Sequence, residues 1–140
     1  MSKTIDYELN GKSYEIYISY PDTFNPGASG RLPCVLIVHA FYGRTEVEDE
    51  YADTIANDCN VVAISVDLYG KGVRGHTRDE CMSLSSALVN NRDELMLRLQ
   101  KALQVAFNIQ GVDVSKVNVH IVLSRFTLNG LIKFKWGSIS

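Results

Sequence analysis

The fold is decided by the stretch Cys34-Val35-Leu36-Ile37-Val38-His39, which follows Pro33. This short apolar run lacks the alternation of polar and apolar residues that marks a half-exposed strand. It therefore predicts a strand covered on both faces, as in a parallel sheet flanked by helices. A similar run occupies residues 61–66. Both runs fall far short of the roughly 20 residues that a membrane helix needs, so no membrane partner is expected.

A helix is predicted between these two strands. Thr45, with Glu48 three residues later, forms a candidate capping box. Apolar residues then recur every four positions at Val47, Tyr51 and Ile55, which predicts a helix over residues 46–57. A strand, a helix and a second strand of this combined length form a parallel crossover unit. The sequence therefore predicts an α/β sheet.

The segment before this unit predicts a hairpin. Residues 4–9 and 14–20 have the composition and alternation of strands, and the turn pair Asn10-Gly11 lies between them. An Asn-Gly pair between two such strands is a strong signal for a tight antiparallel connection.

The segment after the unit predicts two helical regions and a third buried strand. The first region contains Leu84 and Leu88, and the second begins at about residue 92 and ends before Gly111. Five apolar residues line one face of the second helix: Leu95, Leu99, Ala102, Leu103 and Ala106. Residues 112–116 are predicted as a short connection into a strand over residues 117–123.

Composition restricts the partners and the compartment. The chain has 140 residues, 46% of them apolar and 21% charged, within the usual range of one globular domain. Its 14 basic and 16 acidic residues leave no positive excess to attract nucleic acid. Three cysteines without a Cys-x-x-Cys pair, and no apolar signal-peptide core, indicate a cytoplasmic protein. The three histidines have no ligand-like spacing, so neither a metal nor another cofactor is expected.

Three motifs carry a family resemblance. They are Leu36-Ile37-Val38-His39-Ala40-Phe41-Tyr42-Gly43, Val66-Asp67-Leu68-Tyr69-Gly70-Lys71-Gly72 and Asn91-Arg92-Asp93-Glu94-Leu95. In residues, order and spacing, the chain resembles the dienelactone hydrolase family of α/β-hydrolases over residues 33–117. The resemblance implies a three-layer α/β/α fold, with a mostly parallel sheet and an N-terminal antiparallel hairpin. It also implies hydrolysis of a small-molecule lactone or carboxylic ester by a Cys or Ser nucleophile, an Asp and a His.

The chain departs from the family where the nucleophile is due. The family has Gly-x-Cys-x-Gly or Gly-x-Ser-x-Gly after the third buried strand, because the nucleophile sits on a strained turn with small neighbours. This chain has Val122-Leu123-Ser124-Arg125-Phe126 instead. Val122 and Phe126 would occupy the two glycine positions, and their side chains should block the turn. We therefore expect Ser124 to be a strand-end or capping serine.

The acid and the base of a triad are also missing after this point. Residues 125–140 contain no Asp, Glu or His, although the family order is nucleophile, acid, His. A triad rearranged around His39 or His120 with Asp67 is an alternative that no spacing favours. We expect no catalytic residue and no ester hydrolysis by the chain as given. We also expect a single, incomplete domain over residues 1–140, because this fold needs about 200–250 residues.

One element of the family's site is present by resemblance. The loop after the first buried strand donates a backbone N–H to the oxyanion hole, and the resemblance places Phe41 there. Gly43 would allow the turn. Many dienelactone hydrolases carry Glu immediately before this position, whereas this chain has Ala40. An ordinary packed aromatic residue is the alternative interpretation of Phe41.

The Gly-x-Gly-x-x-Gly pattern over residues 70–75 is typical of dinucleotide-binding proteins. That fingerprint needs a helix at once and, about 20 residues later, an acidic residue at the end of a strand. Here Glu94 falls within a predicted helix, so we expect a loop and no nucleotide cofactor.

The cysteines are not expected to be nucleophiles. Cys81 lies beside Asp79 and Glu80, whose charges should raise the pKa of its thiol. Cys34 and Cys59 flank buried strands and are predicted to be small core residues.

Two alternatives to the hydrolase hypothesis follow from the same residues. A sheet that stops after the third buried strand would leave residues 117–123 open on one side. Such an edge is expected to self-associate or bind a partner, which describes a non-catalytic interaction module. The abrupt loss of resemblance near Asn118 would equally fit a truncated or frameshifted product of a hydrolase gene.

Overall fold

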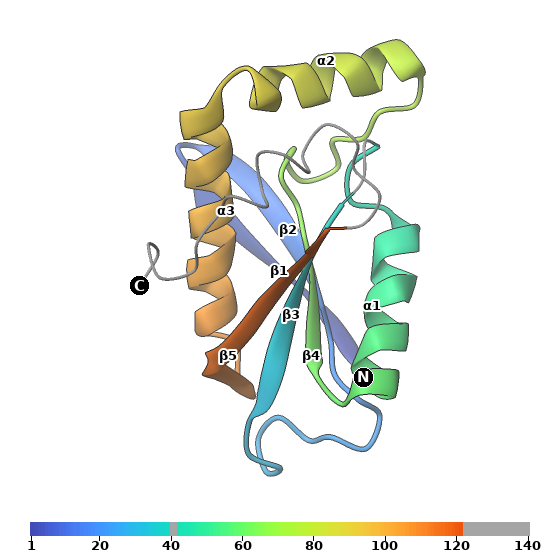
Figure 1. Ribbon diagram of the computed structural model, residues 1–140, viewed down its shortest axis with the longest axis vertical. Helices are drawn as coiled ribbons and strands as arrows, with labels where there is room; N and C mark the ends of the chain where they lie inside the picture. Colours follow the sequence, from blue (N-terminus) through green and yellow to red (C-terminus); the bar gives the residue numbers. More distant parts are fainter. Residues whose placement is uncertain (40–41, 122–140) are drawn as a thin grey trace.

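The computed structural model describes residues 1–39 and 42–121. Figure 1 shows its elements in chain order: β1 (Ser2–Leu9), β2 (Lys12–Ser19), β3 (Leu32–Val38), α1 (Glu46–Cys59), β4 (Val62–Val66), α2 (Arg78–Val89), α3 (Arg92–Phe107) and β5 (Val112–Ile121). The strands form one sheet in the order β1-β2-β4-β3-β5. β1 and β4 are antiparallel to β2, whereas β4 and β5 are parallel to β3.

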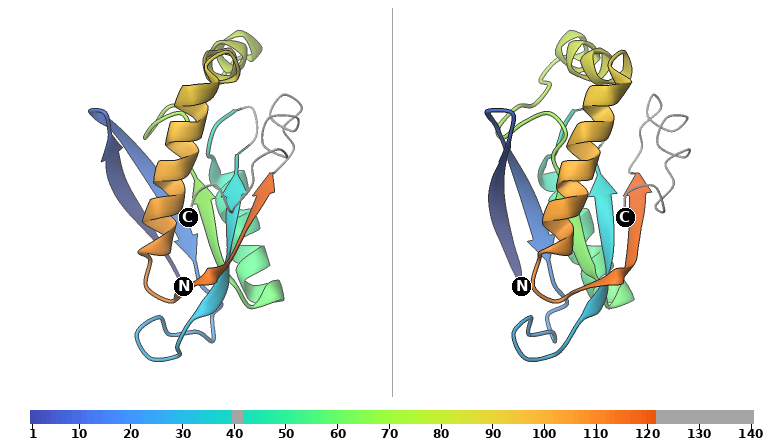
Figure 2. Two further views of the ribbon diagram at one scale, coloured as in Figure 1. Left: turned by 60° about the vertical axis from the view of Figure 1, so that its left-hand side comes forward. Right: turned by 90° about the vertical axis from the view of Figure 1, so that its left-hand side faces the viewer.

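Helices cover both faces of this sheet. α1 packs on one face, against β2, β3 and β4, and α3 covers the other (Figures 1 and 2). α2 lies across the carboxyl ends of β3 and β4, at the top of Figure 1. The predicted three-layer α/β/α fold, with its mostly parallel sheet and antiparallel entry hairpin, is confirmed. None of the helices in residues 1–39 and 42–121 has the length and apolarity that a membrane crossing requires.

The hairpin turn follows from its two residues. Asn10 and Gly11 have φ angles of 52° and 79°. A two-residue turn with both φ angles positive matches the right-handed twist of the strands that it joins, and Asn and Gly tolerate this conformation best. The pairing therefore starts next to the turn at Leu9↔Lys12 and continues to Ser2↔Ser19.

The larger core lies on the α3 side of the sheet. All five residues predicted to line the inner face of α3 are buried there. They pack with the inward side chains of β2, β3 and β4, among them Ile16, Leu36 and Ile64. The periodicity of this helix therefore identified its buried face correctly.

The α1 side has a smaller core, and the prediction for its face needs a correction. The buried apolar residues are Ala52 and Ala56, packed against Ile37 and Ala63 of the sheet. Tyr51 and Ile55 are only partly buried, and Val47 is 66% exposed. The small alanine side chains let the helix lie close to the sheet, so the larger residues flank the contact instead of filling it.

The boundary of β5 also differs from the prediction. Residues 112–116, expected to be a connection, already belong to the strand. Leu32 pairs with Val112 and Cys34 with Val117, so β5 advances five residues where β3 advances two. Within this bulge the Asp113 carboxylate accepts hydrogen bonds from the Ser115 backbone N–H and hydroxyl. A turn centred on Asp is typical of loops, which is why the sequence predicted a connection here. The bulge accommodates this turn within the strand.

The cysteines divide differently from the prediction. Cys34 is buried in β3, as expected. Cys59 is exposed at the end of α1, so its assignment to the core is wrong. Burial of a helix residue depends on whether it lies on the face that contacts the sheet, and being next to a strand in the sequence does not decide this.

Candidate functional site

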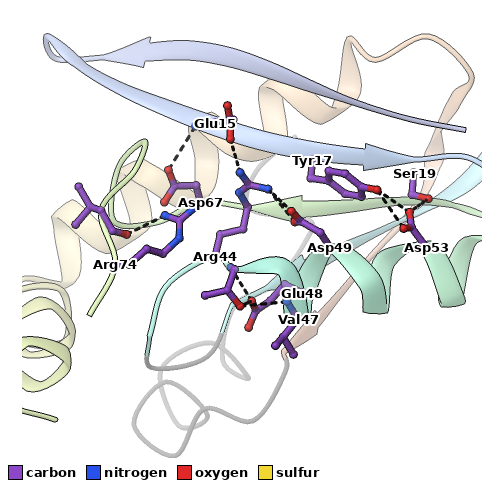
Figure 3. Close-up of polar contacts among 12 residues, drawn as sticks. Glu15, Tyr17, Ser19, Arg44, Val47, Glu48, Asp49, Asp53, Asp67 and Arg74 are labelled. Atoms are coloured by element: carbon purple, nitrogen blue, oxygen red, sulfur yellow. Dashed lines mark hydrogen bonds and ion pairs between the residues drawn. The ribbon is translucent and has the colours of Figure 1, made fainter. Parts of the chain in front are cut away.

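The candidate site lies at the carboxyl ends of β3 and β4. In open α/β sheets, ligands bind in the crevice outside the carboxyl ends of the strands. Two loops meet here, one following β3 and one following β4, and Figure 3 shows the polar contacts around them. Phe41 and Ala40 of the first loop lie outside the described residues, as do Ser124 and the side chain of His120. Their predicted roles therefore stay predictions.

Asp67 shapes the loop after β4. Its Oδ1 atom accepts hydrogen bonds from the backbone N–H groups of Tyr69 and Gly70, each at 3.0 Å. Its Oδ2 atom accepts a longer one, at 3.4 Å, from the N–H of Glu15 in β2. The residue is 1% exposed. This buried carboxylate accepts the hydrogen bonds of the backbone N–H groups in the turn, and it also connects the turn to the neighbouring strand β2.

His39 directly follows the last residue of β3 and joins that strand to the same loop. Its Nε2 atom accepts a hydrogen bond of 3.0 Å from the backbone N–H of Leu68. The ring meets that of Tyr69 edge to face, with 4.6 Å between centroids. An imidazole nitrogen that accepts a hydrogen bond from the backbone does not offer its lone pair to a nucleophile in the same arrangement. His39 and Asp67, the pair of the rearranged triad, thus both hold backbone groups.

Arg44 anchors the loop after β3. Its side chain is 5% exposed, and the guanidinium binds Asp49 of α1 through Nη1, with both N–O distances 2.8 Å. Nη2 binds the carboxylate of Glu15 in β2. Burial raises the pKa of the Asp49 carboxyl, and the positive charge of Arg44 opposes that rise. One buried cation thus connects the loop, a helix and a strand (Figure 3).

Further polar contacts attach α1 to the sheet. The predicted capping box is confirmed: the Thr45 side chain accepts from the Val47 backbone N–H, and Glu48 accepts from the Thr45 N–H. Further along α1, the Asp53 carboxylate accepts hydrogen bonds from the hydroxyl groups of Tyr17 and Ser19 in β2 (Figure 3).

The two loops pack directly against each other. Gly43 has a φ angle of 100°. A Cβ atom there would lie 3.1 Å from both the Tyr69 ring and the carbonyl oxygen of Val73. The N–H of Gly75 donates to the carbonyl of Tyr42 at 3.0 Å. Glycine is therefore required at position 43 both by its backbone angle and by this close approach.

An apolar cavity lies beneath these loops. Its volume is about 10 Å³, and Val38, His39, Leu68, Tyr69, Leu88, Val89 and Leu95 line it. A space of this size holds about one water molecule. The larger hollow, of about 590 Å³, opens at the opposite end of the sheet, between residues 26–31, the end of α3 and the start of β5. It contains none of the candidate site residues.

The glycine-rich loop over residues 70–75 is not arranged for a nucleotide. Gly70 and Gly72 have positive φ angles, but α2 begins only at Arg78. Its first turn is closed by a second capping box, in which Glu80 accepts from the Thr77 N–H. A carboxylate already occupies the helix end where a phosphate would bind.

Cys81 is buried under the same loop. Burial is the larger cause of the raised pKa of its thiol, and Glu80, the neighbour named from the sequence, is the smaller one. Residues 1–39 and 42–121 contain no group of three His, Cys, Asp or Glu side chains that could hold a metal ion.

Sequence reasoning missed the cluster of Arg44, Glu15 and Asp49. Its members come from three separate elements, and nothing in their spacing connects them. One local signal was present: a charged residue stands directly after Gly43, where the chain turns from β3 towards α1.

Comparison with known proteins gives one family and one fold. The family model of the dienelactone hydrolase family matches residues 22–120. A dienelactone hydrolase-like promiscuous phosphotriesterase from metagenomic libraries has 22% sequence identity and a TM-score of 0.75, covering 86% of this chain and 48% of its own. A putative dienelactone hydrolase from Klebsiella pneumoniae has 18% identity and a TM-score of 0.64, covering 86% and 50%. No curated protein matches the chain.

Sequence identity and the share of each chain that is covered determine whether a match shows the fold or the family. At these identities the solved structures show the fold alone, and the chain spans about half of their length. The family match covers well over half of the chain, including β3, α1, β4 and both loops of the candidate site. The resemblance noted in the sequence is confirmed, and the chain belongs to the dienelactone hydrolase family.

Proposed function

We propose that this chain forms the oxyanion-hole side of a hydrolase acting on a small carboxylic ester or lactone, and that its 140 residues alone do not hydrolyse such substrates. The observation that carries the proposal is the loop after β3, which Arg44 anchors to β2 and α1. A backbone N–H stabilises a developing oxyanion only when its direction is fixed in advance. Arg44 supplies such anchoring to the described part of this loop, and we propose that the N–H of Phe41, which lies outside the described residues, is the donor.

The second half of the proposal rests on the titratable groups near that loop. A hydroxyl or thiol nucleophile needs a base within hydrogen-bond reach. The Nε2 atom of His39 is engaged by Leu68, and both oxygens of Asp67 are engaged by backbone N–H groups. Burial and neighbouring charge raise the pKa of Cys81, which suppresses its thiolate. These contacts disfavour a nucleophile and base built from His39, Asp67 and Cys81.

Esterase activity tests the proposal directly. Phenyl acetate should be hydrolysed by the purified chain at the rate of buffer alone, over a range of protein concentrations. Turnover that rises with protein concentration, and disappears in Ser124→Ala or Cys81→Ala, would refute the inactivity. Cys59→Ala is the matched control, because Cys59 is exposed at the far end of α1.

A second candidate function is an interaction module that pairs through β5. β5 is the last strand in the order of the described sheet, and Val114 on it is 49% exposed. Unpaired edges of this kind favour association between chains. Light scattering should detect concentration-dependent dimers that Val114→Lys weakens. Val47→Lys, at an exposed valine of α1, is the control, and a monodisperse monomer at every concentration would contradict this function.

The gene provides an independent test of the proposal that the chain is a truncated or frameshifted product. Translation of the underlying nucleotide sequence in the other two frames would reveal Gly-x-Cys-x-Gly, followed by Asp and His, if the chain is a frameshifted hydrolase product. The cytoplasmic location and the single, incomplete domain are part of the same proposal. Fractionation of the source cells tests the location.

A further inference from the structure

The turn of the entry hairpin contains a chemically reactive pair of residues. Asn10 and Gly11 are the two residues between β1 and β2, and both are exposed. The backbone nitrogen that follows an asparagine can attack Cγ of its side chain, because the two atoms close a five-membered ring. Glycine favours this attack, since it has no Cβ that would obstruct the nitrogen. The pair is therefore a candidate site of spontaneous deamidation.

The structure leaves the nitrogen of Gly11 open to this reaction. Leu9 pairs with Lys12, so the two turn residues lie outside the ladder of strand hydrogen bonds. Within residues 1–39 and 42–121, the N–H of Gly11 donates to no backbone carbonyl. A Cβ added to Gly11 would meet none of the described atoms within 4 Å, its chain neighbours apart. Solvent therefore surrounds this N–H, and hydroxide can remove its proton.

None of the other asparagines in the described part of the chain precedes a glycine. Asn60 is the best match, because it is exposed and has a φ angle of 55°, against 52° for Asn10. The N–H that follows it belongs to Val61 and donates to the Ala56 carbonyl at 3.3 Å. At three further positions the following residue is proline or its N–H is bonded: Asn25 precedes Pro26, the N–H after Asn90 donates to Leu88, and the N–H after Asn108 donates to Ala106.

Local opening of the hairpin gives the ring closure the freedom it needs. The peptide that joins Asn10 to Gly11 must rotate out of the turn before its nitrogen can reach Cγ. β1 is the first strand in the order of the described sheet and pairs there with β2 alone. The tip can therefore open while the pairs from Glu8↔Ser13 onward hold. The fold slows the reaction at this tip without preventing it.

We propose that Asn10 is the first asparagine, among those that the structure describes, to deamidate spontaneously, because its turn leaves the Gly11 N–H without a backbone acceptor. The Gly11 nitrogen loses its proton and bonds to Cγ of Asn10, while the Cγ–Nδ2 bond breaks and ammonia leaves. Water then opens the resulting succinimide at either carbonyl, which gives aspartate or isoaspartate. A second Asn-Gly pair, at residues 129–130, lies outside the described residues. This chemistry does not depend on the hydrolase proposal.

The two products should affect the fold differently. Aspartate followed by glycine suits the same two-residue turn. Isoaspartate adds one atom to the backbone between residues 10 and 11, and the turn has no room for it. The loop after β4 lies on this part of the hairpin: the Lys71 N–H donates to the Ser13 carbonyl at 2.9 Å, and its ammonium pairs with Asp6. Isoaspartate should therefore loosen the contact between the hairpin and this loop of the candidate site.

Ageing of the whole chain tests this inference. The folded protein is incubated in mildly alkaline buffer, and peptide mass spectrometry follows the conversion of each asparagine to an acid. Asn10 should deamidate about tenfold or more faster than Asn60, because the residue after it is glycine with an unbonded N–H. Asn60 is the matched control, since it is exposed and has nearly the same φ angle. Equal rates at these two residues would overturn the proposal.

One variant separates the unbonded N–H from the sequence pair. Val61→Gly creates another Asn-Gly pair, whose glycine N–H donates to the Ala56 carbonyl. In the folded variant Asn60 should stay about fivefold slower than Asn10, because that hydrogen bond must break first. In urea the two residues should react at similar rates. A folded variant in which Asn60 is as fast as Asn10 would overturn the proposal, and if circular dichroism shows no fold, the comparison within the parent chain decides.

The stability of the products tests the effect on the turn. The isoaspartate form, separated from the aged protein by chromatography, should unfold at a lower urea concentration than Asn10→Asp, which carries the same charge on an ordinary backbone. Equal unfolding midpoints of the two forms would contradict the predicted damage to the hairpin.

Discussion

The Nε2 atom of His39 accepts a hydrogen bond of 3.0 Å from the backbone N–H of Leu68, and both residues are buried. The bond joins the end of β3 to the start of the loop after β4. It assigns His39 to a structural contact. The architecture of the loops at the candidate site therefore depends on a side chain that resembles a catalytic group only by residue type.

Replacement of His39 by Ala should destabilise the fold. The N–H of Leu68 would be left buried without this acceptor, at a cost of about 1–3 kcal/mol, in addition to the lost contact with Tyr69. Urea unfolding measures the difference. His76→Ala, at an exposed histidine, should stay within about 0.5 kcal/mol of the parent chain. Equal stability of the two variants would show that the bond contributes nothing.

Replacement of Arg44 by Met should cost more than replacement by Lys. Loss of the buried cation leaves the Asp49 carboxylate without a positive partner, while among the described residues Glu15 keeps only Lys71, at 3.8 Å, and this costs about 3 kcal/mol. Lys keeps the charge but has a single ammonium in place of the two nitrogens that bind Asp49 and Glu15 separately, so it should recover only part of this. Unfolding free energies of both variants, with the exposed Arg92→Met as control, test the order. A stable Arg44→Met would contradict the anchoring of the loop.

Alkaline pH should weaken the fold through the buried Tyr69 and the partly buried Tyr7. Burial raises the pKa of Tyr69 to about 12, and the charge of Cys81 adds to the rise. Burial and, after it, Asp67 also raise the pKa of Tyr7. An unfolded tyrosine loses its proton near pH 10, about where the folded one still keeps it. Stability is thus fully present below about pH 10 and falls as the pH rises, by at most about 1.4 kcal/mol per pH unit for each tyrosine.

Unfolding in urea at about pH 8 and about pH 11 measures this loss. The variants Tyr69→Phe and Tyr7→Phe should each reduce the dependence on pH, because phenylalanine has no proton to lose. An unchanged dependence in both variants would show that other groups cause it.

The three cysteines should react with iodoacetamide at very different rates. Cys59 is exposed, whereas burial raises the pKa of the Cys34 thiol to about 12 and also raises that of Cys81. Alkylation needs an accessible thiolate. Mass spectrometry of the native protein should find carbamidomethyl groups on Cys59 first, and on all three residues in urea. Rapid labelling of Cys81 in the native protein would contradict its burial under the loop after β4.

Sequence patterns were accurate where one local rule decided the structure. Asn10-Gly11 needs two positive φ angles, and the five apolar positions of α3 recur at the helical period. The predictions were wrong where packing against a neighbouring helix or strand decided which residues are buried or paired. Val47 follows the apolar period of α1, yet the sheet buries Ala52 and Ala56 instead. Residues 112–116 resemble a loop, yet they belong to the bulged strand β5 that pairs with β3.

The sequence by itself determined the order of the elements, the hairpin, the Thr45 capping box and the family, because each depends on residues close together in the chain. Only the tertiary structure decided what the polar residues at the carboxyl ends of the strands do. Arg44 meets Glu15 across 29 residues, His39 meets the N–H of Leu68 across 29, and Asp67 meets the N–H of Glu15 across 52. A buried charge or imidazole must satisfy its hydrogen bonds with whatever packing brings within about 3 Å, and no local pattern specifies that partner.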